Sequence, residues 1–252
     1  MRCRTVALRN RVALVTGGSR GIGKEIALAL GCAGLRVAVA FRTNKLGAQK
    51  VVSDLRAAGA EGVALATDVT DPARVKEMME SVAKQLGRLD VLVNNVGDFE
   101  WKPVVESTVE AWGSIIVSNL YSVFYTTKFA LPMMRRQHWG RIINLGAVGA
   151  ERAFGQAKIS AYSAAKAGIV AFTRSVALEE ARHGITANVV NPPVIDEKGL
   201  TLEEAQRLTD VRFPVGRPAT ARDISEAVKF FVSEEAAFIT GQVLNVSGGW
   251  ML

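Results

Sequence analysis

The stretch 12–23 restricts the possible folds more than any other part of this 252-residue chain. An apolar, β-rich run at 12–16 leads into glycines at positions 17, 21 and 23, and an Ala- and Leu-rich helical pattern follows. Glycines at such a turn let the backbone approach a pyrophosphate, and the amides of the following helix face its negative charge. A plain tight turn is the alternative, but the position after the first buried strand favours a dinucleotide site.

Strand and helix patterns alternate along the rest of the chain. Such alternation is typical of a parallel sheet that is covered by helices on both faces. A chain of this length need not be divided, and it contains no linker or repeat, so we expect one α/β domain over 1–252. Further strands are predicted at 37–41, 62–67, 89–93, 141–145, 186–190 and 243–246, and further helices at 45–58, 72–86, 108–136, 161–181 and 221–233.

Composition argues against several other classes of protein. The charge of +7 suits a nucleic-acid binder, but the basic residues are scattered, so this stays a minor alternative. The two cysteines, Cys3 and Cys32, and the two histidines form neither a disulfide framework nor a metal-binding spacing. No apolar run reaches the ~18 residues of a membrane span, and 1–11 is too polar for a signal peptide. We therefore expect a cytoplasmic protein without metal, nucleic-acid or membrane binding.

The end of the second predicted strand indicates which nicotinamide cofactor fits. An acidic residue there would bond a ribose 2′-hydroxyl and repel a 2′-phosphate. Phe41, Arg42 and Thr43 stand there instead. Arg42, together with Arg20, could clamp a phosphate, and Thr43 adds a hydroxyl. The sequence therefore predicts NADP(H) rather than NAD, the alternative being that Arg42 is only a surface cation.

Polar residues follow the third and fourth predicted strands at the same edge of the sheet. Asp68, before Val69, could either cap its loop or meet an adenine amine. The run 94–97 begins with two asparagines, which tolerate unusual backbone angles and bond neighbouring strands, so Asn94 is assigned a structural role. Gly97, at the end of the run, allows close approach of the cofactor. Asn119 lies inside a predicted helix, where it is disfavoured, and it either bonds nearby backbone or holds a water.

Tyr162 and Lys166 are four residues apart on the predicted helix 161–181. Residues with this spacing share one face of a helix, so the phenol oxygen and the ammonium can converge on one substrate atom. A single pair of this kind is a weak signal, because chance can also supply it.

Together, in this order and spacing, these motifs resemble the short-chain dehydrogenase/reductase superfamily, and most closely its 3-oxoacyl-acyl-carrier-protein reductase branch. The resemblance covers nearly the whole chain. It implies a Rossmann fold and a homotetramer, with the helices carrying Asn119 and Tyr162 in one interface and the C-terminal strand in another. The resemblance itself rests on the segments 16–23, 68–69, 94–97, 162–166 and 239–242 and on Asn119.

The resemblance also implies roles for individual residues. Tyr162 would protonate a carbonyl oxygen while the nicotinamide delivers hydride to the carbon. Lys166 and the oxidised nicotinamide would lower the pKa of this phenol, and Asn119 would hold a proton-relaying water. The implied reaction is NADPH-dependent reduction of a small ketone or a 3-oxoacyl thioester, either free or carried by acyl carrier protein. The implied cofactor contacts are Gly17, Ser19, Arg20, Gly21, Ile22, Gly23, Arg42, Thr43, Asp68, Val69, Asn95, Gly97, Tyr162, Lys166, Pro192 and Val194.

Ala147 departs from the family pattern, which places a serine here to bond the substrate carbonyl. Loss of one such donor costs about 2–4 kcal/mol of transition-state stabilisation in comparable sites, or roughly a hundred- to a thousand-fold in rate. Ser160 and Gln156 are candidate substitutes. The alternative function is therefore a catalytically impaired NADP-binding member that serves as a subunit or sensor.

A second departure is Pro193, which replaces the usual glycine after the sixth strand and removes a backbone donor near the nicotinamide. We expect the orientation of the cofactor to differ in detail. The segment 194–218, with a helical patch at 202–208, is interpreted as a substrate loop, with a surface connection as the alternative. Trp101 and Trp112 are interpreted as core or subunit-contact residues rather than as substrate platforms.

Overall fold

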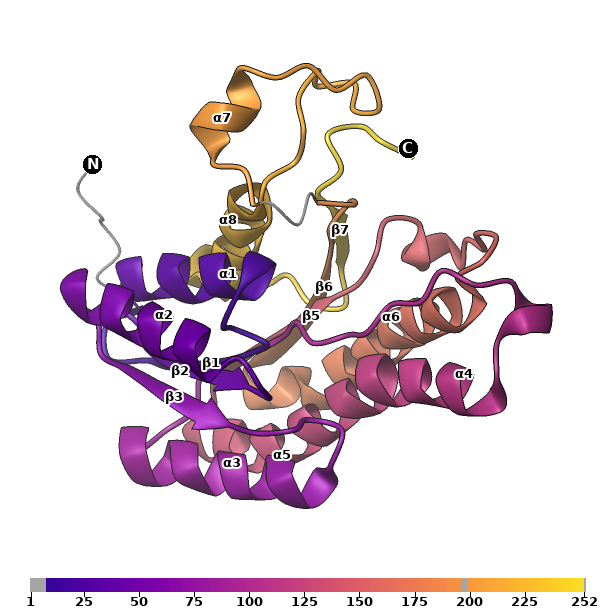
Figure 1. Ribbon diagram of the computed structural model, residues 1–252. Helices are drawn as coiled ribbons and strands as arrows, with labels where there is room; N and C mark the ends of the chain where they lie inside the picture. Colours follow the sequence, from indigo (N-terminus) through magenta and orange to yellow (C-terminus); the bar gives the residue numbers. More distant parts are fainter. Residues whose placement is uncertain (1–7, 196–198, 252) are drawn as a thin grey trace.

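The computed structural model describes residues 8–195 and 199–251, and its centre is one seven-stranded parallel sheet (Figure 1). The strand order is β3-β2-β1-β4-β5-β6-β7. This order, which reverses direction at β1, defines the doubly wound Rossmann fold and confirms the predicted fold class. The strands are β1 (Val12–Thr16), β2 (Arg36–Phe41), β3 (Gly62–Ala66), β4 (Val91–Asn94), β5 (Gly140–Leu145), β6 (Ile185–Asn191) and β7 (Val243–Asn245).

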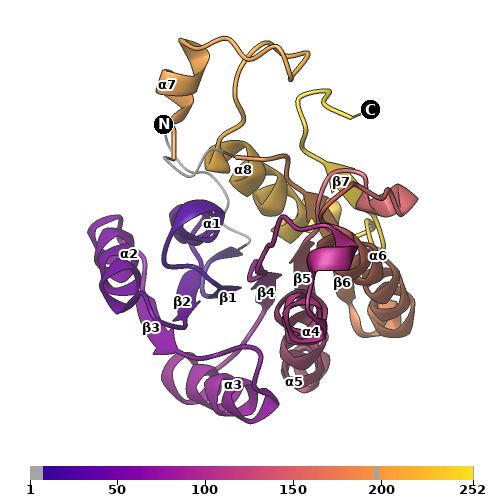
Figure 2. The same cartoon turned by 45° about the vertical axis from the view of Figure 1, so that its right-hand side comes forward.

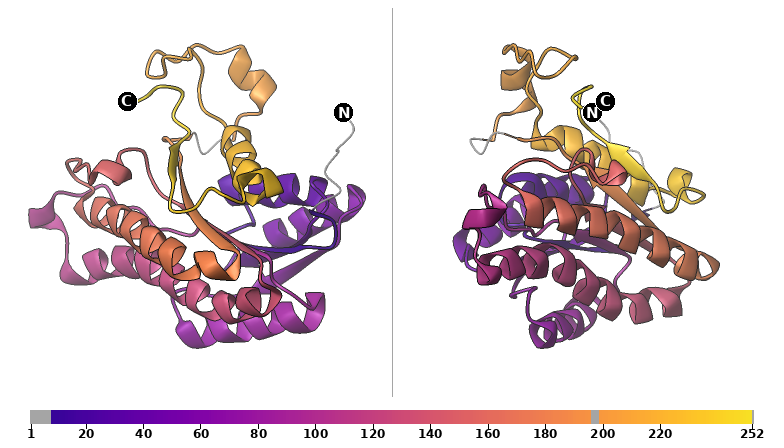
Figure 3. Two further views of the ribbon diagram at one scale, coloured as in Figure 1. Left: turned by 180° about the vertical axis from the view of Figure 1, so that it is seen from behind. Right: turned by 90° about the vertical axis from the view of Figure 1, so that its right-hand side faces the viewer.

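Helices cover both faces of this sheet, as Figures 1 to 3 show from four sides. One layer contains α1 (Gly21–Cys32), α2 (Lys45–Ala57) and α8 (Ala221–Val232). The other contains α3 (Pro72–Leu86), α4 (Val109–Ile116), α5 (Ser122–Gln137) and α6 (Ser160–Glu180). Short 3-10 turns occur at η2 (Val104–Glu106), η4 (Ala150–Arg152), η5 (Ala181–His183) and η6 (Glu234–Ala236).

Alternation along the strands explains the two layers. In β1, Ala13 and Val15 pack with α1, α2 and α8, whereas Val12 and Leu14 pack on the opposite face with α3, α5 and α6. All four side chains are fully buried. Successive residues of a strand point to opposite faces, so a strand that is covered on both sides is apolar throughout. This pattern made the central strands predictable from the sequence.

The predicted helix 108–136 contains an interruption that the sequence pattern did not predict. Between α4 and α5 lies one π-helical turn, η3 (Val117–Tyr121), and Asn119 is at its centre. The side-chain Nδ2 of Asn119 donates to the carbonyls of Ile115 (3.0 Å) and Asp98 (2.8 Å). Single π turns occur mostly at functional sites. The asparagine therefore lies at a local widening of the helix rather than in a regular α-helix.

The described residues 199–218 rise above the sheet edge and contain one short helix, α7 (Leu202–Gln206) (Figure 1). Thr201 and Glu204 form a capping box at its start. The helix ends two residues before the predicted limit at 208. Residues 196–198 of the predicted substrate loop, and residues 1–7 of the predicted domain with Cys3, lie outside the described residues. In the part of the chain that is described, no helix is both long and apolar enough to cross a membrane.

Candidate active site

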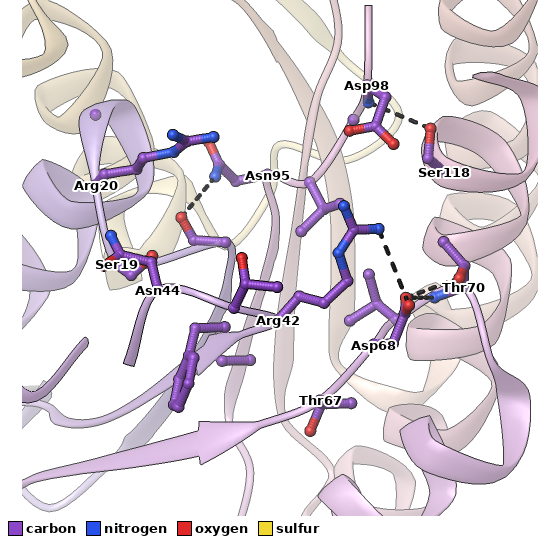
Figure 4. Close-up of a pocket in the computed structure, with 18 of the residues that line it drawn as sticks. Ser19, Arg20, Arg42, Asn44, Thr67, Asp68, Thr70, Asn95, Asp98 and Ser118 are labelled. Atoms are coloured by element: carbon purple, nitrogen blue, oxygen red, sulfur yellow. Dashed lines mark hydrogen bonds and ion pairs between the residues drawn. The ribbon is translucent and has the colours of Figure 1, made fainter. Parts of the chain in front are cut away.

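A pocket of about 670 Å³ opens at the carboxyl ends of β1, β2, β3 and β4 (Figure 4). It lies where the strand order reverses, which is the usual ligand position in open parallel sheets. Its lining includes eleven of the predicted cofactor residues: Gly17, Ser19, Arg20, Gly21, Ile22, Arg42, Thr43, Asp68, Val69, Asn95 and Gly97. The structure therefore brings the residues after four different strands into one cavity.

The glycine turn is pressed between helix α1 and Asn95. A β-carbon at Gly23 would lie 2.4 Å from the Gly17 carbonyl oxygen and 2.6 Å from Nδ2 of Asn95. Nδ2 of Asn95 in turn donates to the carbonyls of Thr16 (3.1 Å) and Gly17 (3.3 Å). Gly23 does not line the pocket; it lets α1 start directly at the turn, so that the first-turn amides face the cavity. Arg20 at the N-cap makes no side-chain bond to these amides. Uncapped amides at the start of a helix fit a dinucleotide phosphate.

Arg42 and Asp68 face each other across the pocket. Figure 4 shows Arg42 extending toward Asp68, and its Nη1 lies 3.9 Å from a carboxylate oxygen, while Arg20 lies on the other side of the cavity. Asp68 accepts bonds from the Thr70 amide (3.0 Å) and hydroxyl (2.7 Å), which is the loop-capping role, one of the two predicted for it. Partial burial raises the pKa of Asp68, but the Thr70 bonds and the Arg42 charge outweigh it and hold the pKa below its usual value.

Asn94 has the structural role that was predicted for it. Its Nδ2 donates to Asn144 (2.8 Å), and its Oδ1 accepts from the Thr126 hydroxyl (2.7 Å), so it ties β4 to β5 and α5. The pocket lining also includes residues that the sequence interpretation did not propose as cofactor contacts, among them Asp98 and Ser118. The Asp98 amide donates to the Ser118 hydroxyl at 3.2 Å. The sequence contains a signal for both, because Asp98 follows Gly97 and Ser118 precedes Asn119, and Gly97 and Asn119 were predicted to lie near the cofactor.

Tyr162 and Lys166 lie one turn apart on α6, as predicted. Nζ of Lys166 lies 5.3 Å from the centre of the Tyr162 ring and donates to the Leu145 carbonyl at 2.8 Å. Leu145 is the last residue of β5. The ammonium is therefore fixed at the carboxyl edge of the sheet, the same edge on which the glycine turn lies. Neither residue lines the pocket of Figure 4, and neither do Pro192 and Val194, which follow β6.

Burial dominates the protonation of both groups. It raises the pKa of the Tyr162 phenol to about 12 and lowers the pKa of the Lys166 ammonium to about 8. In the protein without cofactor, burial therefore determines the direction of the tyrosine pKa, and the lowering of this pKa by Lys166 together with the oxidised nicotinamide stays a prediction. The physical reason is that removing either side chain from water disfavours its charged form.

Ala147 is half-buried at the start of the turn after β5. Of the two candidate substitutes for the missing serine, Ser160 is the first residue of α6. Residues two positions apart in a helix are rotated by about 200° around its axis. Ser160, two positions before Tyr162, therefore faces away from the side that carries Tyr162. Gln156 is exposed in the loop before α6. Of these two side chains, only Gln156 remains free to approach the tyrosine.

Trp101 and Phe99 lie near Tyr162, outside the pocket of Figure 4. Phe99 packs its ring edge-on against Tyr162, and Trp101 packs next to Phe99. Both side chains are about half exposed, and Trp112 is 42% exposed, so the core interpretation of the two tryptophans is wrong. Phe99 was not singled out from the sequence, where only its place two residues after Gly97 marks it.

The comparisons with known proteins agree with this geometry. A family model described as enoyl-(acyl carrier protein) reductase matches residues 17–251. The chain belongs to the short-chain dehydrogenase/reductase family. It is 41% identical over 242 residues to the 3-oxoacyl-[acyl-carrier-protein] reductase FabG of Escherichia coli K12, which covers 95% of this chain and 96% of the relative. The FabG of Pseudomonas aeruginosa is 39% identical over 246 residues, covering 97% and 98%.

Solved structures lead to the same family. Acetoin dehydrogenase YohF from Salmonella typhimurium superimposes with a TM-score of 0.89 at 30% identity, covering 96% of each chain. Within the short-chain dehydrogenase/reductase family, this protein is therefore an oxidoreductase related to the FabG reductases. Among residues 8–195 and 199–251, no three His, Cys, Asp or Glu side chains are grouped to hold a metal ion.

Proposed function

We propose that the protein is an NADPH-dependent reductase that transfers a hydride to a carbonyl group. The observation that carries this proposal is the location of the Tyr162–Lys166 pair. Lys166 is anchored to the end of β5, and the glycine turn follows the end of β1, so both sites share one edge of a parallel sheet. A dinucleotide with its phosphates on the turn extends along this edge, where a proton donor is available.

The cofactor contacts proposed from the sequence are retained. The first-turn amides of α1 and the glycine turn would hold the pyrophosphate, and Arg42, Thr43 and Arg20 would hold the 2′-phosphate. Asp68, Val69, Asn95 and Gly97 would surround the adenosine and the riboses. When bound, the nicotinamide supplies the hydride. Pro192 and Val194 are kept as contacts of the nicotinamide end.

Tyr162 would donate the proton to the carbonyl oxygen. With a pKa raised to about 12 by burial, the phenol is protonated at neutral pH, which suits a general acid. Lys166, held by the Leu145 carbonyl, places a positive charge beside the phenolate that is left after transfer. Asn119 would position the water through which the proton is replaced. Because Ala147 has no hydroxyl, Tyr162 is the main donor to the substrate oxygen.

The cofactor preference is tested by exchanging charge at Arg42. Arg42→Asp should lower the preference for NADPH over NADH about 10- to 100-fold, the range of a lost charge-assisted bond. Lys76→Asp makes the same change of charge on the exposed face of α3, away from the pocket, and should leave the preference unchanged. The measurement is kcat/KM for each cofactor with a fixed ketone. A wild type that prefers NADH would overturn the NADP part of the proposal.

The substrate, the loop and the assembly complete the proposal. Relatives named as 3-oxoacyl-acyl-carrier-protein reductase and acetoin dehydrogenase support a thioester or a small ketone as substrate. The single domain 1–252 would use the segment 194–218 to cover the substrate. A homotetramer is supported by exposed apolar residues on α5 (Phe124) and on and near β7 (Leu244, Phe238), the elements that the family places in interfaces.

A second candidate function is favoured by Ala147 alone: a cofactor-binding subunit or sensor with little catalysis. NADPH would then raise the Tm as it does for an enzyme, because binding to the folded state stabilises it. A broad panel of carbonyl substrates would however give no turnover above the rate without protein. Turnover that depends on Tyr162 would exclude this second function.

A further inference from the structure

A row of aromatic rings starts at Tyr162 and leads away from it. The ring centroid of Phe99 lies 5.1 Å from that of Tyr162, with the planes at 80°, and the Trp101 ring lies 6.1 Å from Phe99. Phe99 and Trp101 are 54% and 55% exposed. These two large rings are exposed, and they lie one after the other in space beside the phenol that is the proposed proton donor. They form an apolar surface next to the place where the substrate carbonyl would bind.

Hydrogen bonds hold the segment that carries these rings at both ends. At its start, the backbone of Asp98 donates to the Ser118 hydroxyl (3.2 Å) and accepts from Nδ2 of Asn119 (2.8 Å). At its end, the Lys102 amide donates to the Lys158 carbonyl at 2.6 Å. This last bond joins the segment after β4 to the loop before α6, which run side by side in Figures 1 and 2. The rings are therefore positioned before any ligand arrives, which reduces the entropy cost of binding.

The charges near the rings do not favour an anionic ligand. Glu100 and Lys102, the charged side chains that flank Trp101, lie 3.8 Å from each other and neutralise one another. The surface that remains for a ligand is that of Phe99 and Trp101. An uncharged, flat group matches it best, because aromatic rings prefer the edge of another ring or an offset face in addition to burying area. A saturated group of equal size would gain only the area.

We propose that Phe99 and Trp101 form a substrate subsite for an aromatic ring attached to the reacting carbonyl. The substrate class is an aryl ketone or an aryl-substituted 3-oxo compound, whose ring packs on Phe99 while its oxygen faces Tyr162. This inference rests on the proposed reductase function and narrows its substrate class.

The test uses two ketones of equal carbon number, acetophenone and cyclohexyl methyl ketone. For each protein, the ratio of kcat/KM for the aryl ketone to that for the cycloalkyl ketone is measured with NADPH. Comparison of this ratio between variants cancels the different intrinsic reactivities of the two carbonyls. Phe99→Leu and Trp101→Leu should each lower the ratio about three- to tenfold, the range of one aromatic contact. Phe230→Leu removes an exposed aromatic ring on α8, outside this row, and should leave the ratio unchanged.

The same variants give a binding arm that does not depend on turnover. Calorimetry measures the Kd of 1-phenylethanol and of 1-cyclohexylethanol, and the preference for the aryl alcohol should fall in Phe99→Leu and Trp101→Leu. If wild type reduces neither these ketones nor an acetoacetyl thioester, the reductase proposal fails, and this arm still decides on the subsite. If the ketones are reduced, but the kcat/KM ratio and the Kd ratio both stay at their wild-type values in Phe99→Leu and in Trp101→Leu, the aryl subsite is wrong and the reductase function stands.

Discussion

A β-carbon added at Gly97 would lie 2.2 Å from Oδ1 of Asn119. The glycine that ends the β4 loop and the asparagine of the π-helical turn therefore fit only as a pair. Asn119 itself is fully buried and tied to the Asp98 and Ile115 carbonyls. The contact connects the proposed cofactor pocket, which Gly97 lines, to the helix before α6, which carries the proposed proton donor Tyr162.

Gly97→Ala should displace Asn119 and break its bonds to the backbone. We expect a loss of about 1–3 kcal/mol in the free energy of unfolding, as for overpacking in a core, together with weaker NADPH binding. Gly113→Ala is the matched control, because nothing lies within 4 Å of its added carbon and it is inside α4. That variant should be stabilised by a few tenths of a kcal/mol. Thermal unfolding and NADPH titration measure both effects, and equal behaviour of the two variants would refute the contact.

The pH dependence of reduction should follow Lys166. Burial lowers the pKa of its ammonium to about 8, whereas the Tyr162 phenol, with a pKa of about 12, stays protonated. Because the charged lysine is the active form, kcat/KM should be retained below pH 8 and fall about tenfold per unit above it. In Lys166→Arg the residual activity should lack this decline, because arginine does not deprotonate. A wild-type profile that is flat to pH 9.5 contradicts the role of Lys166.

Ala147→Ser should restore the donor that the family usually has. The position is half-buried at the turn after β5, so a hydroxyl adds little volume. We expect kcat/KM for a carbonyl substrate to rise at least about tenfold. Steady-state kinetics with NADPH measure the effect, and Ala161→Ser, half-buried next to the tyrosine, serves as the control. No gain in Ala147→Ser would indicate that another group, such as Gln156, already supplies the bond.

The pair Arg135–Glu180 should make stability depend on pH. Glu180 is fully buried, and Nε of Arg135 donates to it at 2.8 Å, which holds the pKa of the carboxyl below its usual value. A carboxyl group whose pKa is lower in the folded than in the unfolded protein adds its full stabilisation when the pH is above the unfolded-state pKa. This stabilisation is lost as the pH falls through the folded-state pKa. Glu180→Gln should lower the Tm by about 3–8 °C at pH 7, and by less at the lowest pH at which the protein still folds. An equal loss at both pH values would contradict the ion pair.

Much of the fold could be predicted because local patterns and global structure agree. The continuous apolar run of β1 and the glycine turn after it predicted a buried parallel strand and a phosphate site. The structure confirms the sheet, and it places the residues of four strand ends around one pocket. Helix limits agreed to within a few residues because caps such as Asp71 before Pro72 and Gly184 after η5 are visible in the sequence.

Other features depend on contacts between distant residues and could not be predicted. The π turn at Asn119 arises because its side chain reaches back to Asp98, and helical periodicity contains no information on such a bond. Likewise, the 3.9 Å approach of Arg42 to Asp68, which follows the neighbouring strand, is a long-range contact that the sequence pattern does not contain. Phe99 was overlooked because a single apolar residue in a loop is common; only its packing on Tyr162 makes it notable.

The reduction of a carbonyl by Tyr162 is tested most directly by a single-turnover measurement. The protein is mixed in excess over NADPH with a saturating ketone, and the loss of NADPH absorbance is followed for wild type and for Tyr162→Phe. NADPH binding is measured separately for both proteins, because Tyr162 is also a proposed cofactor contact, and the excess of protein is chosen so that NADPH is bound in each. We expect a rate constant at least about a hundredfold lower in Tyr162→Phe. Equal rate constants, with equal NADPH binding, would contradict it.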